Sequence, residues 1–206
     1  GRPTAESCAP SLSRRNLPRR ADRADSSWPR DTVATCYPPA VPDLLASLAA
    51  SVAARLVARR ETVAVSESST GGLISAALLS IPGASAYFVG GGVVYTQTAR
   101  RGLLQLPDEA VRGIRSSTEA AARLHAKTIR ERLGTTWALA ETGAAGPTRN
   151  RYGDAAGHSC FAVAGAIEAA RTLETGRADR EANMWAFTRA ALELLDTCIQ
   201  QAGGTS

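Results

Sequence analysis

The spacing of apolar residues divides the chain into two parts. Residues 1 to about 40 include the stretch "SLSRRNLPRRADRADSSWPRDT", which is rich in Arg, Ser, Asp and Pro and has no periodic apolar positions. Such a segment buries too little apolar surface to offset the entropy that is lost on folding. We therefore expect residues 1–40 to form a disordered tail and residues 41–202 to form the folded domain.

Within residues 41–202, helix-like and strand-like patterns alternate. Apolar residues recur at helical spacing from 44 to 57, which predicts a helix. The remaining patterns predict strands at 61–66, 86–96, 136–141, 158–166 and 170–175, the last two as a hairpin, and helices at 71–80, 97–105, 117–133 and 179–200. This alternation predicts an α/β fold, a three-layer sandwich in which helices flank a mixed sheet.

Length and composition narrow the class of protein. The chain has 206 residues, enough for one domain with a core, and its 44% of apolar residues is ordinary for a globular protein. No apolar run approaches the roughly 20 residues that cross a bilayer, and no signal-peptide pattern is present. We therefore expect a cytoplasmic protein without a membrane partner.

The basic character of the chain comes from arginine. The net charge is +5, and Lys127 is the only lysine among the 24 basic residues. No run of basic residues alternates with aromatic ones, as it does in many nucleic-acid-binding surfaces. Solvated surface arginine explains the charge, so we expect no nucleic-acid partner.

The residue types that bind metal ions are few and scattered. Cys8, Cys36, Cys160 and Cys198 show no CxxC spacing, and His125 and His158 are the only histidines. This pattern is typical of reduced thiols in a cytosolic protein rather than of a zinc site. We expect neither a metal nor another cofactor.

Three polar turns lie at or just beyond the ends of predicted strands, where α/β proteins gather their sites. They read "SESSTGG" at 66–72, "YTQTAR" at 95–100 and "TGAAGP" at 142–147. Capping of the following helix explains one hydroxyl of the first turn. It does not explain four hydroxyls followed by two glycines. Backbone N–H groups at such a helix start can hold a phosphate or an oxyanion, and a serine beside a base can be a nucleophile.

Taken together, these segments resemble the C-terminal domain of the competence/damage-inducible protein CinA, over roughly residues 42–200. The family motif Ala-Glu-Ser-Cys-Thr-Gly-Gly reads here as "SESSTGG", and "TGIAGP" reads as "TGAAGP". The spacing of "IPGASAYFVGGGVVYT" between them also fits. The chain resembles the stand-alone form of the family, without the larger domain of long CinA proteins.

The resemblance implies an amidohydrolase that converts nicotinamide mononucleotide, or a related amide, to the acid and ammonia. Ser68 matches the family nucleophile, and Tyr95 and Arg180 match residues that surround the ribose-phosphate and the carboxamide. The expected partners are a nucleotide substrate and further copies of the chain. The glycine-rich turns supply the remaining residues that we expect to bind substrate: Thr70, Gly71, Gly72, Thr142, Gly143 and Gly146.

The chain differs from the family at the residue that acts as the base. The family uses a lysine at the position of Arg100, and a guanidinium keeps its proton at any working pH. Arg100 can therefore only stabilise an anion or fix the substrate. Glu141, which replaces an apolar residue before the "TG" turn, either pairs with Arg100 or serves as the base, with His158 as the runner-up. The alternative is a nucleotide-binding protein that has lost turnover.

Overall fold

The computed structural model describes residues 43–204 of the chain. The predicted tail at 1–40, with Cys8 and Cys36, lies outside these residues and stays a prediction. The helices are α1 (Asp43–Arg59), α2 (Leu73–Leu79), α3 (Gln97–Leu103), α4 (Glu119–Leu133) and α5 (Arg180–Gly203). The strands are β1 (Val63–Glu67), β2 (Phe88–Val93), β3 (Trp137–Ala144), β4 (His158–Ala164) and β5 (Ala169–Glu174).

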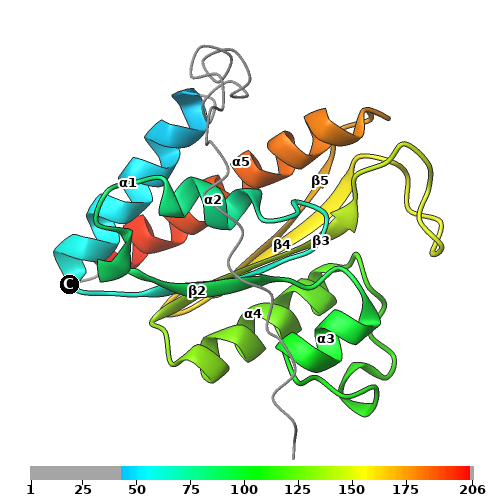
Figure 1. Cartoon of the computed structure of the whole chain (residues 1–206), viewed down its shortest axis with the longest axis horizontal. Coiled ribbons are helices and arrows are strands. Elements are labelled where there is room, and N and C mark those ends of the chain that lie inside the picture. Colours follow the sequence, from blue (N-terminus) through cyan, green and yellow to red (C-terminus); the bar gives the residue numbers. More distant parts are fainter. Residues whose placement is uncertain (1–42, 205–206) are drawn as a thin grey trace, which may run out of the picture. The chain divides into compact units, whose positions relative to one another are not determined.

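The five strands form one mixed sheet in the order β2-β1-β3-β4-β5. Strand β1 runs parallel to β2 and β3, whereas β3 and β4, and β4 and β5, are antiparallel. Helices α1, α2 and α5 cover one face, and α3 and α4 cover the other (Figure 1). The predicted three-layer α/β sandwich and the hairpin of the last two strands are confirmed.

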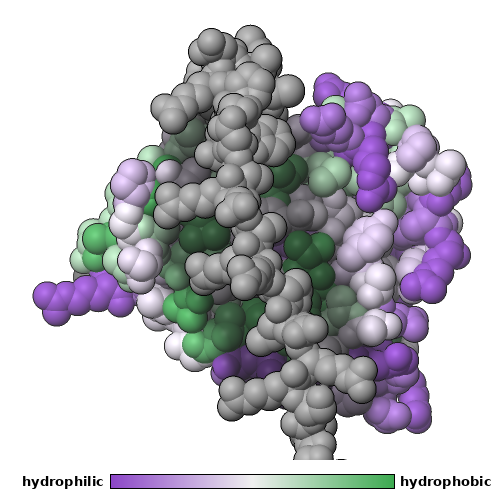
Figure 2. Space-filling view, in the orientation of Figure 1, coloured by the Kyte–Doolittle hydropathy of each residue, from purple (hydrophilic) through white to green (hydrophobic). Residues whose placement is uncertain are grey.

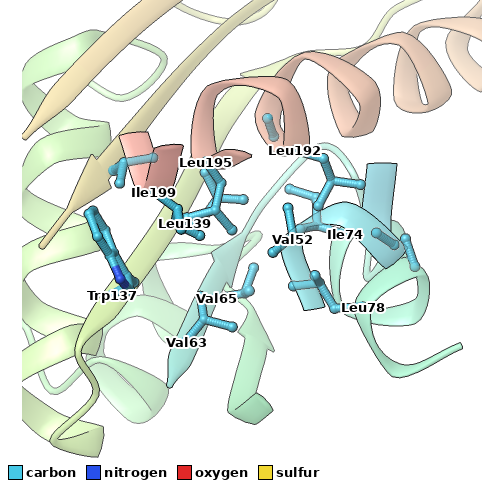
Figure 3. Close-up of a cluster of buried hydrophobic side chains, with 14 of the residues drawn as sticks. Val52, Val63, Val65, Ile74, Leu78, Trp137, Leu139, Leu192, Leu195 and Ile199 are labelled. Carbon is cyan, nitrogen blue, oxygen red and sulfur yellow. The ribbon is translucent and has the colours of Figure 1, made fainter. Parts of the chain in front are cut away.

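The larger apolar core lies between the sheet and helices α1, α2 and α5. Val63 and Val65 of β1 and Leu139 of β3 pack against side chains of these helices, as Figure 3 shows. Trp137 is fully buried at the start of β3, and its indole Nε1 donates to Glu61 Oε2 at 2.7 Å. Burial of such side chains contributes about 1.5–3 kcal/mol each, so this layer fixes β1 and β3 firmly beside one another.

The opposite face of the sheet packs against α4 through small side chains. Ala122, His125, Ala126 and Ile129 are buried at the spacing that places them on one side of the helix. Alanines let the helix approach the sheet closely. His125 is the polar member of this otherwise apolar stripe.

Strand β3 is longer than the sequence suggested. It continues to Ala144, so residues 142–144 belong to a strand and the following loop spans 145–157. Pairing with β4 extends the strand, with Ala144 opposite His158. Gly143 permits this close pairing, because a Cβ there would lie 2.6 Å from the carbonyl oxygen of His158.

Among residues 43–204, no helix is both long and apolar enough to cross a membrane.

Candidate active site

Two buried carboxylates hold the turn between β1 and α2. Glu67 follows Val63 and Val65 on the side of the sheet that carries α2, because side chains alternate along a strand. Its Oε2 accepts hydrogen bonds from the backbone N–H groups of Gly72 and Ile74, both at 3.0 Å, and its Oε1 accepts one from Ser75 N at 2.8 Å. Glu67 thus satisfies the free N–H groups at the start of α2.

This arrangement corrects the expectation that a hydroxyl caps α2. The N-cap residue is Gly72, which makes no side-chain cap bond, and the Glu67 carboxylate takes that place. A carboxylate at a helix N-terminus is also favoured by the helix dipole.

Glu141 holds the same turn from β3. Its Oε2 accepts from Ser68 N at 2.9 Å and from Thr70 N at 3.1 Å, and its Oε1 accepts from the hydroxyls of Ser69 and Ser159. The carboxylate is fully buried. Both oxygens are therefore occupied by donors of the turn and of β4.

The sequence suggested two roles for Glu141, an ion pair with Arg100 or a general base. The expected pairing with Arg100 is wrong, since the oxygens of Glu141 bind the turn. The assignment of Glu141 as general base stays a prediction, and this geometry favours a structural role, because both oxygens already accept hydrogen bonds from groups of the protein.

The backbone N–H groups of the turn are used within the protein. Thr70 N donates to Glu141, Gly71 N to the carbonyl of Ser68 at 3.2 Å, and Gly72 N to Glu67. Gly71 and Gly72 adopt φ values of +65° and +103°, which favour glycine. The glycines serve the tight turn, and the expected role of Thr70, Gly71 and Gly72 in binding substrate stays a prediction.

One hydroxyl of the turn faces a cavity. Ser66, Ser69 and Thr70 are buried, whereas Ser68 is half-buried and lines a cavity of about 520 Å³. The cavity is lined by Ser68, Val94, Tyr95, Thr96, Gln97, Arg100, Ser116, Ser117, His125, Thr142, Gly143, Asn150, Arg151 and Tyr152. Ser68, Tyr95, Arg100, Thr142 and Gly143, all singled out from the sequence, thus lie around one hollow.

Arg180 connects Tyr95, which lines the cavity, with Gly146 of the loop after β3. Its Nη2 donates to Tyr95 Oη at 3.3 Å and its Nη1 donates to the carbonyl of Gly146 at 2.8 Å. Asp179 caps the start of α5 by accepting from Ala182 N at 3.0 Å, which fixes where Arg180 projects. The structure therefore brings these three predicted site residues together.

Arg100 is tied to its own side of the cavity. Its Nη1 donates to the carbonyls of Leu106 at 2.8 Å and Pro107 at 3.0 Å, and its Nη2 pairs with Asp108. Hydrogen bonds from Arg101 and Arg100 hold the pKa of Asp108 below its ordinary value. The predicted role of Arg100 toward a substrate anion stays a prediction, since its guanidinium already fastens the loop at 106–108.

Comparison with known proteins decides the family. The model of the CinA C-terminal domain matches residues 45–199. The chain belongs to the CinA C-terminal domain family. A CinA-like protein of Synechococcus sp. (strain RCC307) is 37% identical over 139 residues, which are 68% of this chain and 33% of that protein. A putative competence-damage inducible protein of Desulforamulus reducens is 45% identical over 87 residues, 42% of this chain and 21% of that protein.

Solved CinA structures share the fold. The competence/damage inducible protein CihA from Agrobacterium tumefaciens superposes with a TM-score of 0.72 at 28% identity, covering 78% of this chain and 99% of that one. A CinA superfamily protein from Klebsiella pneumoniae gives 0.71 at 27% identity, covering 76% and 98%. The chain spans about a third or less of the length of the curated relatives quoted above.

In this CinA domain, His158 does not line the cavity but contacts Ser117, which does. It is buried, its Nδ1 contacts the carboxylate of Glu174, and its Nε2 lies 2.9 Å from the carbonyl of Ser117. Carboxylate and carbonyl oxygens only accept hydrogen bonds, so the protonated ring, which donates from both nitrogens, satisfies both contacts. His158, the runner-up for the base, is therefore engaged at both ring nitrogens.

The pKa of His158 follows from these contacts. Burial lowers the pKa, but the hydrogen bonds to Glu174 and Ser117 and the nearby negative charges raise it more, so the net shift is upward. Ser117 in turn donates its N–H to Thr142 Oγ1 at 3.2 Å. His158 and Thr142 thus clamp Ser117 from opposite sides and hold one wall of the cavity.

The raised pKa gives His158 a predictable effect on stability. A group whose pKa is raised on folding stabilises the fold fully below its ordinary pKa, here 6.5, and loses that contribution as pH rises through the folded pKa. We expect His158→Gln to lower the melting temperature at pH 6 and to lower it less at pH 8.5. Melting curves of the two proteins across this range test it, and a difference that grows with pH would contradict the clamp.

His125 is a residue of the cavity that sequence reasoning missed. Burial, and then the charge of Arg100, lowers its pKa to about 4. Its Nδ1 is buried without a hydrogen-bond partner. The available signal was its place in the apolar stripe of α4, which a sequence pattern alone assigns to the core.

Within residues 43–204, no group of three or more His, Cys, Asp or Glu side chains is placed to hold a metal ion. Cys160 and Cys198 are buried free thiols, and burial raises the pKa of both.

Proposed function

We propose that this protein is an amidohydrolase of the CinA C-terminal type, which converts nicotinamide mononucleotide or a related amide to the acid and ammonia. The observation that carries the proposal is the presentation of Ser68. Two fully buried carboxylates, Glu67 and Glu141, fix the turn at 66–72, and Ser68 is the residue of that turn that lines the cavity. A serine held rigidly beside a substrate-sized hollow fits a nucleophile.

The reaction follows from that placement. The Ser68 oxygen attacks the carboxamide carbon, and the carbon–nitrogen bond breaks as ammonia leaves with the proton that Ser68 gave up. Water then attacks the resulting ester and releases the acid, and Ser68 regains a proton. The net reaction is hydrolysis of the amide by one water molecule to the acid and ammonia.

The cavity suits a mononucleotide in size and charge. Its volume of about 520 Å³ lies in the range of small-molecule sites, roughly 300–1,000 Å³. Figure 2 shows hydrophilic residues gathered on the side where the loop after β3 and the start of α5 lie. Arg151 of the cavity wall and Arg180, which bridges Tyr95 and Gly146, are exposed there. We assign Arg180 to the phosphate because its guanidinium is positioned by two neighbours yet open to solvent.

The assignment of Arg180 predicts a loss of phosphate recognition. We expect Arg180→Ala to weaken binding of nicotinamide mononucleotide at least tenfold, about 1.4 kcal/mol, because an ionic hydrogen bond is lost. Isothermal titration measures it, with nicotinamide riboside as the ligand without phosphate. Arg123→Ala, on the exposed face of α4 and outside the cavity lining, is the matched control. Equal affinities of the parent for nucleotide and nucleoside would rule the assignment out.

A second candidate is a nucleotide-binding protein without turnover. The fastening of Arg100 to the loop at 106–108 favours it, and so does the saturation of both Glu141 oxygens. On this reading, nucleotides raise the melting temperature but remain chemically unchanged.

We further propose that copies of this chain associate in the cytoplasm. Strand β2 is an edge of the sheet, and its Val89 and Val93 are exposed. Leu103 and Leu133, also exposed, lie against Gly92 and Gly90 of the same strand. Exposed apolar edge strands commonly pair with another chain. Light scattering should give a mass of at least two chains, and a monomer at micromolar concentration would contradict association.

A further inference from the structure

Ser68 needs a group that accepts its proton, because a neutral serine hydroxyl is a weak nucleophile. The two carboxylates that hold the turn of Ser68 are unsuited. Glu67 and Glu141 are fully buried, and each accepts hydrogen bonds at both oxygens. His158 donates through both nitrogens, and the guanidinium of Arg100 has no lone pair to offer.

His125 is the remaining nitrogen base on the cavity wall. Its ring lines the main cavity and an adjoining recess of about 80 Å³, so it stands where the two meet. Its Nδ1 is shielded from solvent, which leaves Nε2 as the nitrogen that an occupant of the cavity can reach. Side chains on a helix tilt toward its N-terminus, and α4 begins just after Ser116 and Ser117, which also line the cavity.

The charge state of His125 fits this place. Burial and the charge of Arg100 lower its pKa to about 4, so the ring is neutral at pH 7 and keeps a free electron pair. The positive charge of Arg100 also disfavours a lasting imidazolium. A proton taken up by His125 is therefore passed on readily rather than retained.

Unpaired buried polar atoms also occur in the layer between the sheet and α4. Within residues 43–204, the buried side-chain polar atoms without a hydrogen-bond partner are His125 Nδ1 and Ser66 Oγ. Ser66 lies two residues after Ala64 on β1, on the side of the sheet that packs with Ile129 of α4. An unpaired buried polar group costs about 1–3 kcal/mol, so each such group calls for an explanation, of which a catalytic role is one and a bound water or ion is another.

We propose that His125 is the proton acceptor for Ser68, acting through Nε2 either directly or across one water molecule in the cavity. This inference rests on the proposed function. The proton leaves Ser68 Oγ as the oxygen bonds to the carboxamide carbon, passes to His125, and then reaches the departing nitrogen, which leaves as ammonia. Water later gives a proton to His125 and its oxygen to the ester, and the proton returns to Ser68. The role requires the tautomer with its hydrogen on Nδ1.

A serine-directed probe separates this inference from the identity of the substrate. A fluorophosphonate reacts with an activated serine whatever amide the protein hydrolyses, and peptide mass spectrometry locates the adduct. At pH 7.5 we expect the parent to be labelled at Ser68 and Ser68→Ala not to be. His125→Gln should slow labelling at least about a hundredfold, the size of a general-base contribution. Lys127→Gln, on the exposed face of the same helix, should match the parent.

Two further arms exclude a merely structural role. His125→Ala should lose labelling and regain part of it when free imidazole is added, with melting curves confirming that the variant is folded. In the parent, the labelling rate should stay flat from pH 8 to 6 and fall as pH approaches the His125 pKa of about 4. The pH dependence is measured on the parent protein, so it remains a valid test even if the substitutions disturb folding.

The outcomes are distinct. Labelling of folded His125→Gln within about threefold of the parent would overturn the inference, as would loss in His125→Ala without any regain by imidazole. Failure to label Ser68 in the parent would overturn both the inference and the nucleophile. Labelling at Ser68 that depends on His125, without ammonia release from nicotinamide mononucleotide, would support His125 and reject only the proposed substrate.

Discussion

Replacing Ser68 with alanine is expected to lower ammonia release from nicotinamide mononucleotide by roughly 10⁴-fold or more, the effect of losing a nucleophile in comparable hydrolases. The reason is the position of this hydroxyl. It is the member of the turn at 66–72 that lines the cavity, whereas the hydroxyls of Ser66, Ser69 and Thr70 are buried. A coupled ammonia assay measures the rate, and mass spectrometry follows formation of the acid.

The fold and the binding of nucleotide should survive this substitution. Ser68 makes its structural contact through its backbone N–H to Glu141, which alanine retains. Ser80→Ala, which removes an exposed hydroxyl at the end of α2, is the matched control and should keep full activity. Unchanged activity in Ser68→Ala would remove the nucleophile assignment and leave the turn as a cradle for ligand.

Replacing Glu141 with glutamine should reduce both stability and activity. The carboxylate accepts hydrogen bonds from Ser68, Thr70, Ser69 and Ser159, and an amide nitrogen placed at either oxygen presents hydrogens to donors. We expect a loss of about 2 kcal/mol and a melting temperature lower by roughly 4–8 °C. Ammonia release should fall as well, since the turn no longer holds Ser68 in place.

The pattern of effects separates the two roles of Glu141. A residue that positions the turn changes the melting temperature and kcat together, and Glu168→Gln, an exposed glutamate between β4 and β5, should change neither. A hundredfold loss of kcat with an unchanged melting temperature would instead identify Glu141 as the general base.

The fold followed from local patterns because its elements obey local rules. The alternation of helical and strand spacing located every strand and each α-helix to within a few residues. Asp179 is an example of such a local rule. An aspartate directly before a helical run favours the start of a helix through its own side chain, and Asp179 is the N-cap of α5. The end of β3 was missed because it depends on pairing with β4, a partner that local patterning does not register.

The candidate site was predicted less completely because its contacts join distant segments. The sequence motifs identified Ser68, Tyr95 and Arg180, which the fold places around one cavity or at its edge. Glu141 accepts a hydrogen bond from Ser68, which is 73 positions away, so no local pattern could show whether Glu141 holds the turn or acts as a base. His125 was overlooked because a histidine in an apolar helical stripe reads as core until the cavity beside it is known.

The amidohydrolase proposal depends on what happens to nicotinamide mononucleotide when it is incubated with the purified protein at pH 7.5. We expect ammonia and nicotinic acid mononucleotide to form in equal amounts, many times per protein chain, and neither product to form with Ser68→Ala. A nucleotide that raises the melting temperature of the protein and is recovered unchanged would contradict the account and establish a binding protein in its place.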